Sequence, residues 1–125
     1  MKLFIFILLF TMNSVSAMGN GQNDQARCEK LSGFQFSDST VTLATFIAAG
    51  KFSDPNGEVH EVPAFCLIKG IARPTSVSRI NFEVWLPTDT WNGRYYQFGG
   101  GGLEGYIYYP ALAKFLSEGN AVATT

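Results

Sequence analysis

The stretch Trp91-Asn92-Gly93-Arg94-Tyr95-Tyr96-Gln97-Phe98-Gly99-Gly100-Gly101-Gly102-Leu103-Glu104-Gly105 decides the fold, because three different elements follow one another in it. Asn92-Gly93 is typical of a tight turn, and the aromatic run from Arg94 to Phe98 predicts a strand. The glycines after it leave backbone N–H groups free of side-chain obstruction, which suits them to bind an oxyanion or a phosphate. This segment is therefore the main candidate for a functional site.

The flanking sequence predicts an α/β fold. After Gly105, apolar residues at helical spacing predict a helix with Pro110 in its first turn and a stop at Gly119, and a buried strand begins at Ala121. Before the stretch we expect a helix at 24–31, strands at 41–47, 62–72 and 78–86, and a loop at 51–61. The short link between the last two strands predicts an antiparallel hairpin, after which the sheet becomes parallel.

Period-two alternation predicts which side chains of two strands face the core. In the strand at 78–86, the predicted inward set is Ile80, Phe82, Val84 and Leu86, and the outward set is Arg79, Asn81, Glu83 and Trp85. In the strand at 41–47, Val41, Leu43, Thr45 and Ile47 share one face.

The amino terminus predicts export. Lys2 precedes a short, wholly apolar run, and Val15-Ser16-Ala17 supplies a small-residue cleavage site, so residues 1–17 are expected to be a signal peptide and 18–125 the mature part. No second long apolar run follows, so we expect no membrane anchor and a secreted protein. The formal net charge of −1, with no basic block, argues against nucleic acid as a partner.

Cys28 and Cys66 are the only cysteines in the chain. In an oxidising compartment one disulfide between them is expected, with two unpaired buried thiols as the alternative. On the chain-entropy model, closing a loop of this length contributes about 4 kcal/mol of stability.

Three interpretations compete for the glycine segment. Gly100-Gly101-Gly102-Leu103-Glu104-Gly105 matches the dinucleotide pattern G-x-G-x-x-G, but that fingerprint belongs to the first strand of its domain, and three predicted strands precede it here. A purely structural turn would not need so many glycines. An oxyanion hole makes physical sense, although no serine of the chain has the G-x-S-x-G context of an esterase nucleophile.

His60 is the only histidine, and it lies between Glu58 and Glu61 in the predicted loop. We expect it to be a solvated surface residue rather than a catalytic one. No second histidine or clustered carboxylate stands at ligand spacing in the sequence, so no metal site is predicted.

Several motifs in the right order resemble the amino-terminal part of the tannase and feruloyl esterase family. They are Val62-Pro63-Ala64-Phe65-Cys66, Ile80 to Pro87, Trp91-Asn92-Gly93-Arg94 with its glycine run, and Ala121-Val122-Ala123-Thr124. The resemblance covers roughly Cys28 to Thr125. It implies the amino-terminal portion of an α/β-hydrolase fold, truncated before the nucleophile elbow, in a secreted serine esterase that acts on small aromatic-acid esters.

The resemblance also implies roles for individual residues. It pairs Cys28 with Cys66 and makes Gly101 and Gly102 half of an oxyanion hole, with Gly102 as the expected N–H donor. Gly100 stands where members often have asparagine, which affects any hydrogen bond that would fix the loop. The family's Ser-Asp-His triad would lie beyond Thr125, as would the lid domain that binds calcium, so no cofactor is expected in this chain.

We therefore expect a fragment of a feruloyl esterase or tannase that is inactive alone. The alternative is a small secreted module that binds aromatic ligands through Trp85, Trp91, Tyr95 and Tyr96 without catalysis.

Overall fold

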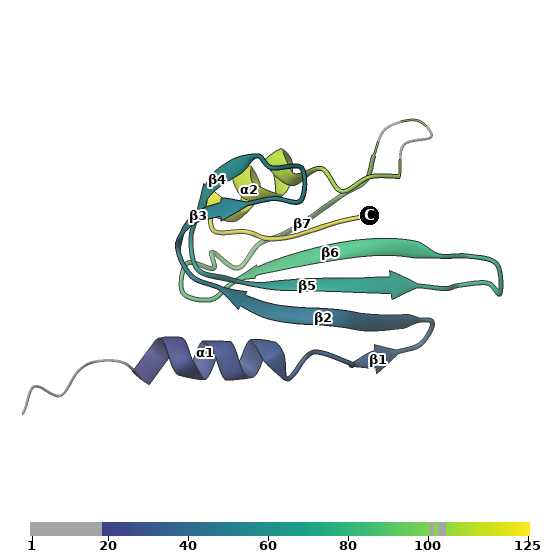
Figure 1. The fold of residues 1–125 in the computed structure, drawn as a ribbon, viewed down its shortest axis with the longest axis horizontal. Helices are drawn as coiled ribbons and strands as arrows, with labels where there is room; N and C mark the ends of the chain where they lie inside the picture. The colour runs from purple at the N-terminus through teal and green to yellow at the C-terminus, as the bar shows by residue number, and fades with distance from the viewer. Residues whose placement is uncertain (1–18, 101, 103–104) are drawn as a thin grey trace, which may run out of the picture.

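Six strands form the main sheet of the computed structural model, which describes residues 19–100, 102 and 105–125 (Figure 1). The elements in chain order are α1 (Gly19–Glu29), β1 (Gln35–Phe36), β2 (Ser39–Ile47), β3 (Gly50–Ser53), β4 (Val59–Val62), β5 (Phe65–Ala72), β6 (Ile80–Pro87), β7 (Tyr95–Phe98), α2 (Tyr109–Ser117) and β8 (Ala121–Thr124). The predicted signal peptide, residues 1–17, lies outside the described residues. Among those described, neither helix has the length and apolar content needed to cross a bilayer.

The main sheet is mixed, and most of its strand pairs are antiparallel. Its order is β1-β2-β5-β6-β8-β7, and β7 and β8 form the parallel pair. The predicted hairpin is confirmed, with Phe65 opposite Pro87 and Ala72 opposite Ile80. The expected change to parallel pairing comes one strand later than predicted, because β8 joins β6 antiparallel and only then pairs with β7.

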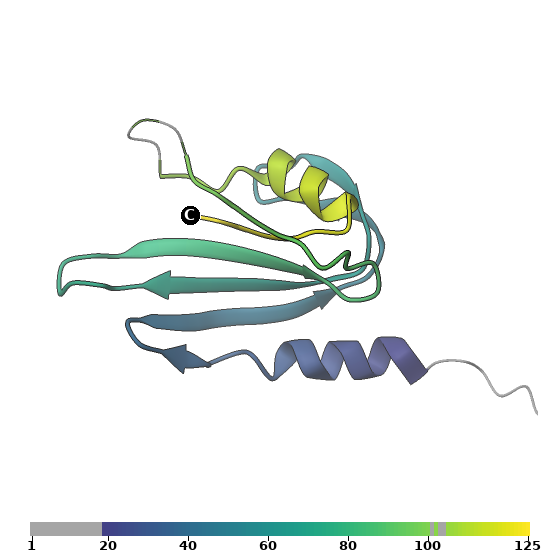
Figure 2. The same cartoon turned by 180° about the vertical axis from the view of Figure 1, so that it is seen from behind.

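Helices and a hairpin cover both faces of this sheet (Figure 2). The disulfide Cys28–Cys66 joins α1 to β5 on one face, with a Cα–Cα distance of 5.5 Å, and Val41, Ala44 and Ile68 pack around it. The other face packs against α2, where Leu112 and Leu116 are fully buried. The disulfide prediction is therefore confirmed.

Coverage of both faces corrects the predicted orientation of β6. Glu83 and Trp85, expected to face solvent, are 4% and 0% exposed, whereas Ile80, expected inside, is 42% exposed. Val84 and Leu86 pack against the disulfide side, and Trp85 packs against the α2 side. Simple alternation assigns one face to solvent, and this strand has no solvent face in its second half.

A β-bulge corrects the predicted face of β2. The register shifts between Val41 and Leu43, so Val41 and Ala44 are both buried while Leu43 is 42% exposed. The extra residue in the bulge reverses the alternation after it.

The predicted loop at 51–61 is a β-hairpin. Strands β3 and β4 pair antiparallel around the turn that Asp54-Pro55-Asn56-Gly57 predicted, and Gly57 has the positive φ of 86° that this turn needs. Phe52 from this hairpin packs edge-on against Trp85, with ring centroids 5.2 Å apart. The hairpin thus closes the core beside α2.

The Asn92-Gly93 turn is hydrogen-bonded to the carboxyl end of α2. The Asn92 side chain donates to the carbonyl of Glu118 at 2.9 Å, and its backbone N–H donates to the carbonyl of Gly119 at 2.9 Å. Gly119 has φ 83°, and a Cβ there would lie 2.5 Å from the carbonyl oxygen of Thr90. The predicted stop at Gly119 is confirmed, as is Pro110 in the first turn.

Candidate active site at the strand ends

The glycine segment leaves β7 at the edge where the carboxyl ends of the parallel pair meet. Phe98, the last residue of β7, stands in register with Thr124, the last residue of β8. The turn between β5 and β6 and the carboxyl ends of β7 and β8 point toward the same side of the molecule (Figure 1). In open α/β sheets this edge is where ligands bind.

A cleft of about 390 Å³ opens at this edge. It is lined by Arg79, Ile80, Asn81, Gly99, Gly100, Gly105, Ile107 and Thr125. The glycines on one wall contribute backbone only, and Arg79 forms no ion pair within the described part of the chain. The cleft therefore combines exposed peptide groups with one unpaired cation, an arrangement that suits a ligand carrying or developing negative charge.

Gly102 is the one member of the predicted oxyanion pair that the structure describes. It is exposed and has φ 66°, a left-handed backbone that favours glycine. Gly101 lies outside the described residues, as do Leu103 and Glu104. The assignment of Gly101 and Gly102 to an oxyanion hole stays a prediction.

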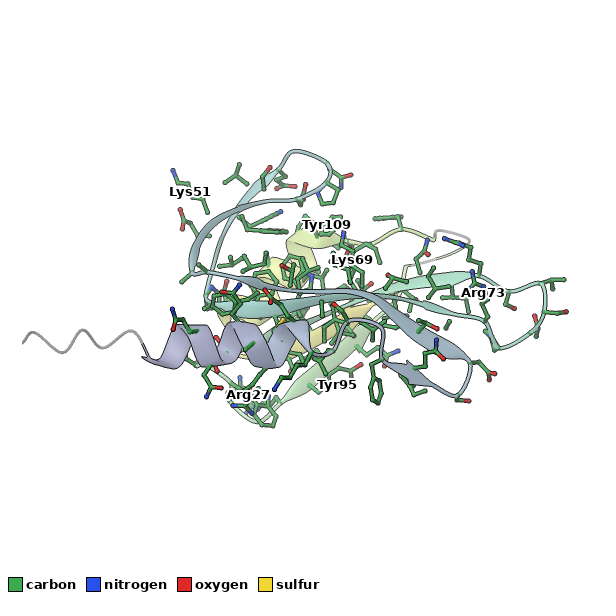
Figure 3. All side chains as sticks on the ribbon, turned by 60° about the horizontal axis from the view of Figure 1, so that its bottom comes forward. Arg27, Lys51, Lys69, Arg73, Tyr95 and Tyr109 are labelled. Atoms are coloured by element: carbon green, nitrogen blue, oxygen red, sulfur yellow. A yellow bond between two sulfur atoms is a disulfide. The ribbon has the colours of Figure 1, made fainter. Side chains whose placement is uncertain are left out.

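Beside the cleft lies a polar network centred on the buried Glu83, which sequence reasoning missed. The Glu83 carboxylate accepts hydrogen bonds from the Trp85 indole at 3.0 Å and the Tyr109 hydroxyl at 2.9 Å, and it pairs with Lys69 Nζ at 3.0 Å. Lys69 and Tyr109 lie close together near the centre of the molecule (Figure 3). Burial, and then the Glu83 charge and hydrogen bond, raise the pKa of Tyr109, so its hydroxyl stays a donor.

No sequence signal marked this network, because Glu83 occupied an outward position in the predicted alternation. The buried Glu83 and the partly exposed Lys69 stand opposite each other in the β5–β6 register, a cross-strand pair that only the hairpin alignment reveals.

His60 is not the solvated residue that the sequence predicted. Its side chain is 9% exposed, and Nε2 lies 2.9 Å from the Asp54 carboxylate. Asp54 also accepts hydrogen bonds from the backbone N–H groups of Asn56 and Glu58. The bond between His60 and Asp54 joins β4 to the turn of the β3–β4 hairpin, and His60 is not among the residues that line the glycine cleft.

The same hairpin brings together three groups that the sequence spacing did not suggest. Asp54, Glu58 and His60 offer ligand atoms within 4.8 Å of one another. The set does not fit calcium, because calcium takes six to eight oxygen ligands and here one group is an imidazole. Both oxygens of Asp54 are already occupied by the hairpin's own donors.

The aromatic residues of the alternative hypothesis do not form one surface. Trp85 is fully buried and stacks on Phe65 at 4.6 Å, which removes it from any ligand site. Trp91, Tyr95 and Tyr96 are 63%, 57% and 42% exposed. Tyr96 stacks on Phe115 of α2 at 5.0 Å, so part of its ring serves packing.

The fold and the cleft define a mixed α/β protein with a glycine-rich loop at its strand ends, and comparison with known proteins shows which proteins it resembles. The family described as tannase and feruloyl esterase matches residues 66–125. An uncharacterized esterase of Xanthomonas campestris pv. campestris is 38% identical over 120 residues, covering 95% of this chain and 21% of the relative. A probable feruloyl esterase B-1 of Aspergillus oryzae is 29% identical over 117 residues, covering 85% and 22%.

Solved structures agree with these relatives. Feruloyl esterase B from Aspergillus oryzae superposes with a TM-score of 0.68 at 31% identity, over 79% of this chain and 20% of that one. An esterase from the same organism superposes with a TM-score of 0.69 at 27% identity, over 80% and 21%. The family resemblance is confirmed: the chain is related to the tannases and feruloyl esterases, and it spans about a fifth of the length of these relatives.

Proposed function

We propose that this chain is the amino-terminal part of a secreted serine carboxylic-ester hydrolase of the tannase and feruloyl esterase type. Its contribution is the oxyanion-hole loop, with backbone N–H donors from Gly101 and Gly102. The observation that carries the proposal is the position of the glycine segment, directly after β7, beside the parallel β7–β8 ends and before α2. An N–H donor there can stabilise the negative oxygen that forms when a nucleophile attacks an ester carbonyl.

The strand order supports an α/β-hydrolase layout for this portion. The link from β7 through α2 brings β8 back between β6 and β7, so that β8 is antiparallel to one neighbour and parallel to the other. In that fold, one oxyanion-hole N–H comes from the loop between the third strand and the first helix. If β5 and β6 are counted as the first two strands, β7 is the third strand and α2 the first helix, so the β7–α2 loop corresponds to that loop.

In this proposal the chain supplies only the oxyanion-hole part of the active site. The serine nucleophile, the acid and the histidine are supplied by sequence that follows Thr125, and an aromatic-acid ester binds in the cleft with its carbonyl oxygen toward the glycine loop. The chain alone is then inactive, because a donor loop without a nucleophile forms no acyl-enzyme.

The test compares the complete gene product with residues 18–125 alone, using methyl ferulate and methyl gallate as substrates. We expect the complete protein to hydrolyse at least one ester and to be blocked by a serine-directed phosphonate. The short chain should show no more hydrolysis than a version lacking residues 99–105. Hydrolysis by the short chain above that control, or none by the complete protein, would contradict the proposal.

A second candidate is an aromatic-ligand module, which the exposure of Trp91, Tyr95 and Tyr96 favours. Titration of residues 18–125 with ferulic acid, followed by tryptophan fluorescence, tests it. Saturable quenching that Trp91→Ala abolishes would support the module, since Trp85 is buried and does not report on surface binding.

A further inference from the structure

A transverse row of residues crosses the sheet toward the start of the glycine loop. Lys69 on β5 stands opposite Glu83 on β6, Glu83 stands opposite Thr124 on β8, and Thr124 stands beside Phe98 on β7. Phe98 is the last residue before the glycines. The entry to the loop is thus fixed by strand pairing, two strands away from the strand that carries Glu83.

The carboxyl end of the glycine loop, where α2 begins, is held by a side-chain hydrogen bond instead of by strand pairing. Tyr109 is the first residue of α2, and the preceding N-cap residue, Tyr108, makes no side-chain capping hydrogen bond. The first turn of the helix therefore lacks the usual side-chain support for its free N–H groups. Instead, the Tyr109 hydroxyl reaches the sheet and donates to Glu83 Oε1 at 2.9 Å.

Glu83 is well suited to act as a fixed anchor. It is 4% exposed, and its carboxylate is engaged by Tyr109, Lys69 and the Trp85 indole. Trp85 is itself fully buried between Phe65 and Phe52, so the acceptor cannot rotate away without breaking contacts in the core. A buried carboxylate with this many donors holds one geometry, because each broken bond would leave a polar group unpaired.

We propose that Glu83 is a positioning residue that holds the exit of the glycine loop through the Tyr109 hydroxyl, so that the loop is anchored at both ends on one row of the sheet. The proposal rests on the proposed function for its catalytic consequence, because an oxyanion hole works only when its donors are held to about half an ångström. Neither Glu83 nor Tyr109 touches the substrate in this role.

The test uses the complete gene product and compares Tyr109→Phe with Tyr108→Phe. Both variants remove one hydroxyl at the start of α2, but Tyr108 is 49% exposed and has no bond to Glu83. In Tyr109→Phe, amide hydrogen exchange in residues 99–108 should rise roughly tenfold while exchange in β5 and β6 stays unchanged. Ester hydrolysis should lose about tenfold in kcat with KM nearly unchanged, because the loss falls on the transition state. Tyr108→Phe should change neither.

Glu83→Gln gives an independent check, because glutamine cannot accept from all three donors. It should raise loop exchange at least as much as Tyr109→Phe does. Unchanged exchange in residues 99–108 of Tyr109→Phe would overturn the anchor, and so would an equal rise across β5 and β6, which would show general loosening of the core. If the wild-type protein hydrolyses no ester, the proposed function fails, while the exchange data still decide whether Glu83 anchors the loop.

Discussion

At the scale of single residues, Gly102 carries the most direct prediction about catalysis. Its φ of 66° is accessible to glycine, and an L-residue with a Cβ, such as alanine, costs about 1–2 kcal/mol there. Alanine would meet no atom within 4 Å, so its effect comes from backbone conformation alone. In the complete protein, Gly102→Ala should lower kcat for ester hydrolysis about tenfold by moving the N–H donor.

Gly57→Ala is the matched control for this change. Gly57 has φ 86°, also has open space around its Cβ position, and lies in the β3–β4 turn away from the cleft. Both variants should lose similar stability in thermal melts, but only Gly102→Ala should lose kcat. Equal kcat in the two variants would remove Gly102 from the oxyanion hole.

Predictability at this scale depended on whether a residue's environment was local. Pro110, Gly119 and the Asn92-Gly93 turn were predicted correctly because turn and cap chemistry is set by neighbours in the sequence. Glu83 and His60 were predicted to be solvated, and both are largely buried against partners. Their partners Tyr109 and Asp54 meet them only through packing and a hairpin register that no local pattern encodes.

At the scale of elements, α1 depends on its disulfide to an unusual degree. Among the side chains of α1 whose burial the structure describes, Cys28 alone is buried, and most of the others are polar. Reducing the disulfide should therefore free α1 from β2 and β5 while the strands stay folded. Hydrogen exchange should rise more in residues 19–31 than in β5, and the protein should lose about 4 kcal/mol of stability on the chain-entropy model.

The double variant Cys28→Ala/Cys66→Ala provides the control, because a reductant should leave its exchange unchanged. Persistent protection of residues 19–31 after complete reduction would show that packing, rather than the covalent bond, holds the helix.

The β3–β4 hairpin should be sensitive to acid through Asp54. The hydrogen bond from His60 lowers the pKa of Asp54, assisted by the backbone N–H groups of Glu58 and Asn56 and opposed by burial. Because the folded pKa lies below the ordinary value of about 3.9, the stability that Asp54 contributes is complete above about pH 4. That contribution is lost as the pH falls through the folded pKa.

In Asp54→Asn, Tm should therefore fall less steeply than in the wild type as the pH drops below about 4. Asp89→Asn is the control, since Asp89 is exposed and its removal should leave the acid limb unchanged. Parallel acid limbs in wild type and Asp54→Asn would rule out this carboxylate as the sensitive group.

Elements with strong sequence patterns were predictable, and elements with weak or irregular patterns were not. The hairpin β5–β6, the aromatic strand β7 and helix α2 all lie where the sequence placed them. The strands β3 and β4 were missed because the turn signal between them dominates a segment with little apolar alternation, whereas the equally short β7 is mostly aromatic. The bulge in β2 could not be predicted, because nothing in its run of β-branched and small residues indicates a change of register.

At the scale of the whole molecule, the position of β8 could not be derived from local pattern. The sequence predicted a final buried strand, and all four residues of β8 are buried. Its insertion between β6 and β7 is a property of how α2 crosses the sheet. That insertion places β7 at one end of the strand order, with the exposed Tyr95 and Tyr96 on it.

This arrangement predicts how residues 18–125 behave when expressed alone. An edge strand with unpaired backbone groups and exposed aromatic residues is a template for pairing with another chain. The segment should therefore self-associate with rising concentration in sedimentation velocity experiments. Tyr95→Lys should shift the segment toward monomer, because a charge on an edge strand opposes pairing. Tyr95 is suited to this change because it belongs to neither core cluster of the described residues, so its replacement leaves the core intact. Val77→Lys is the matched control: Val77 is 92% exposed in the β5–β6 turn, so the same charge should leave association unchanged. A monodisperse monomer at high concentration would show that β7 needs no partner.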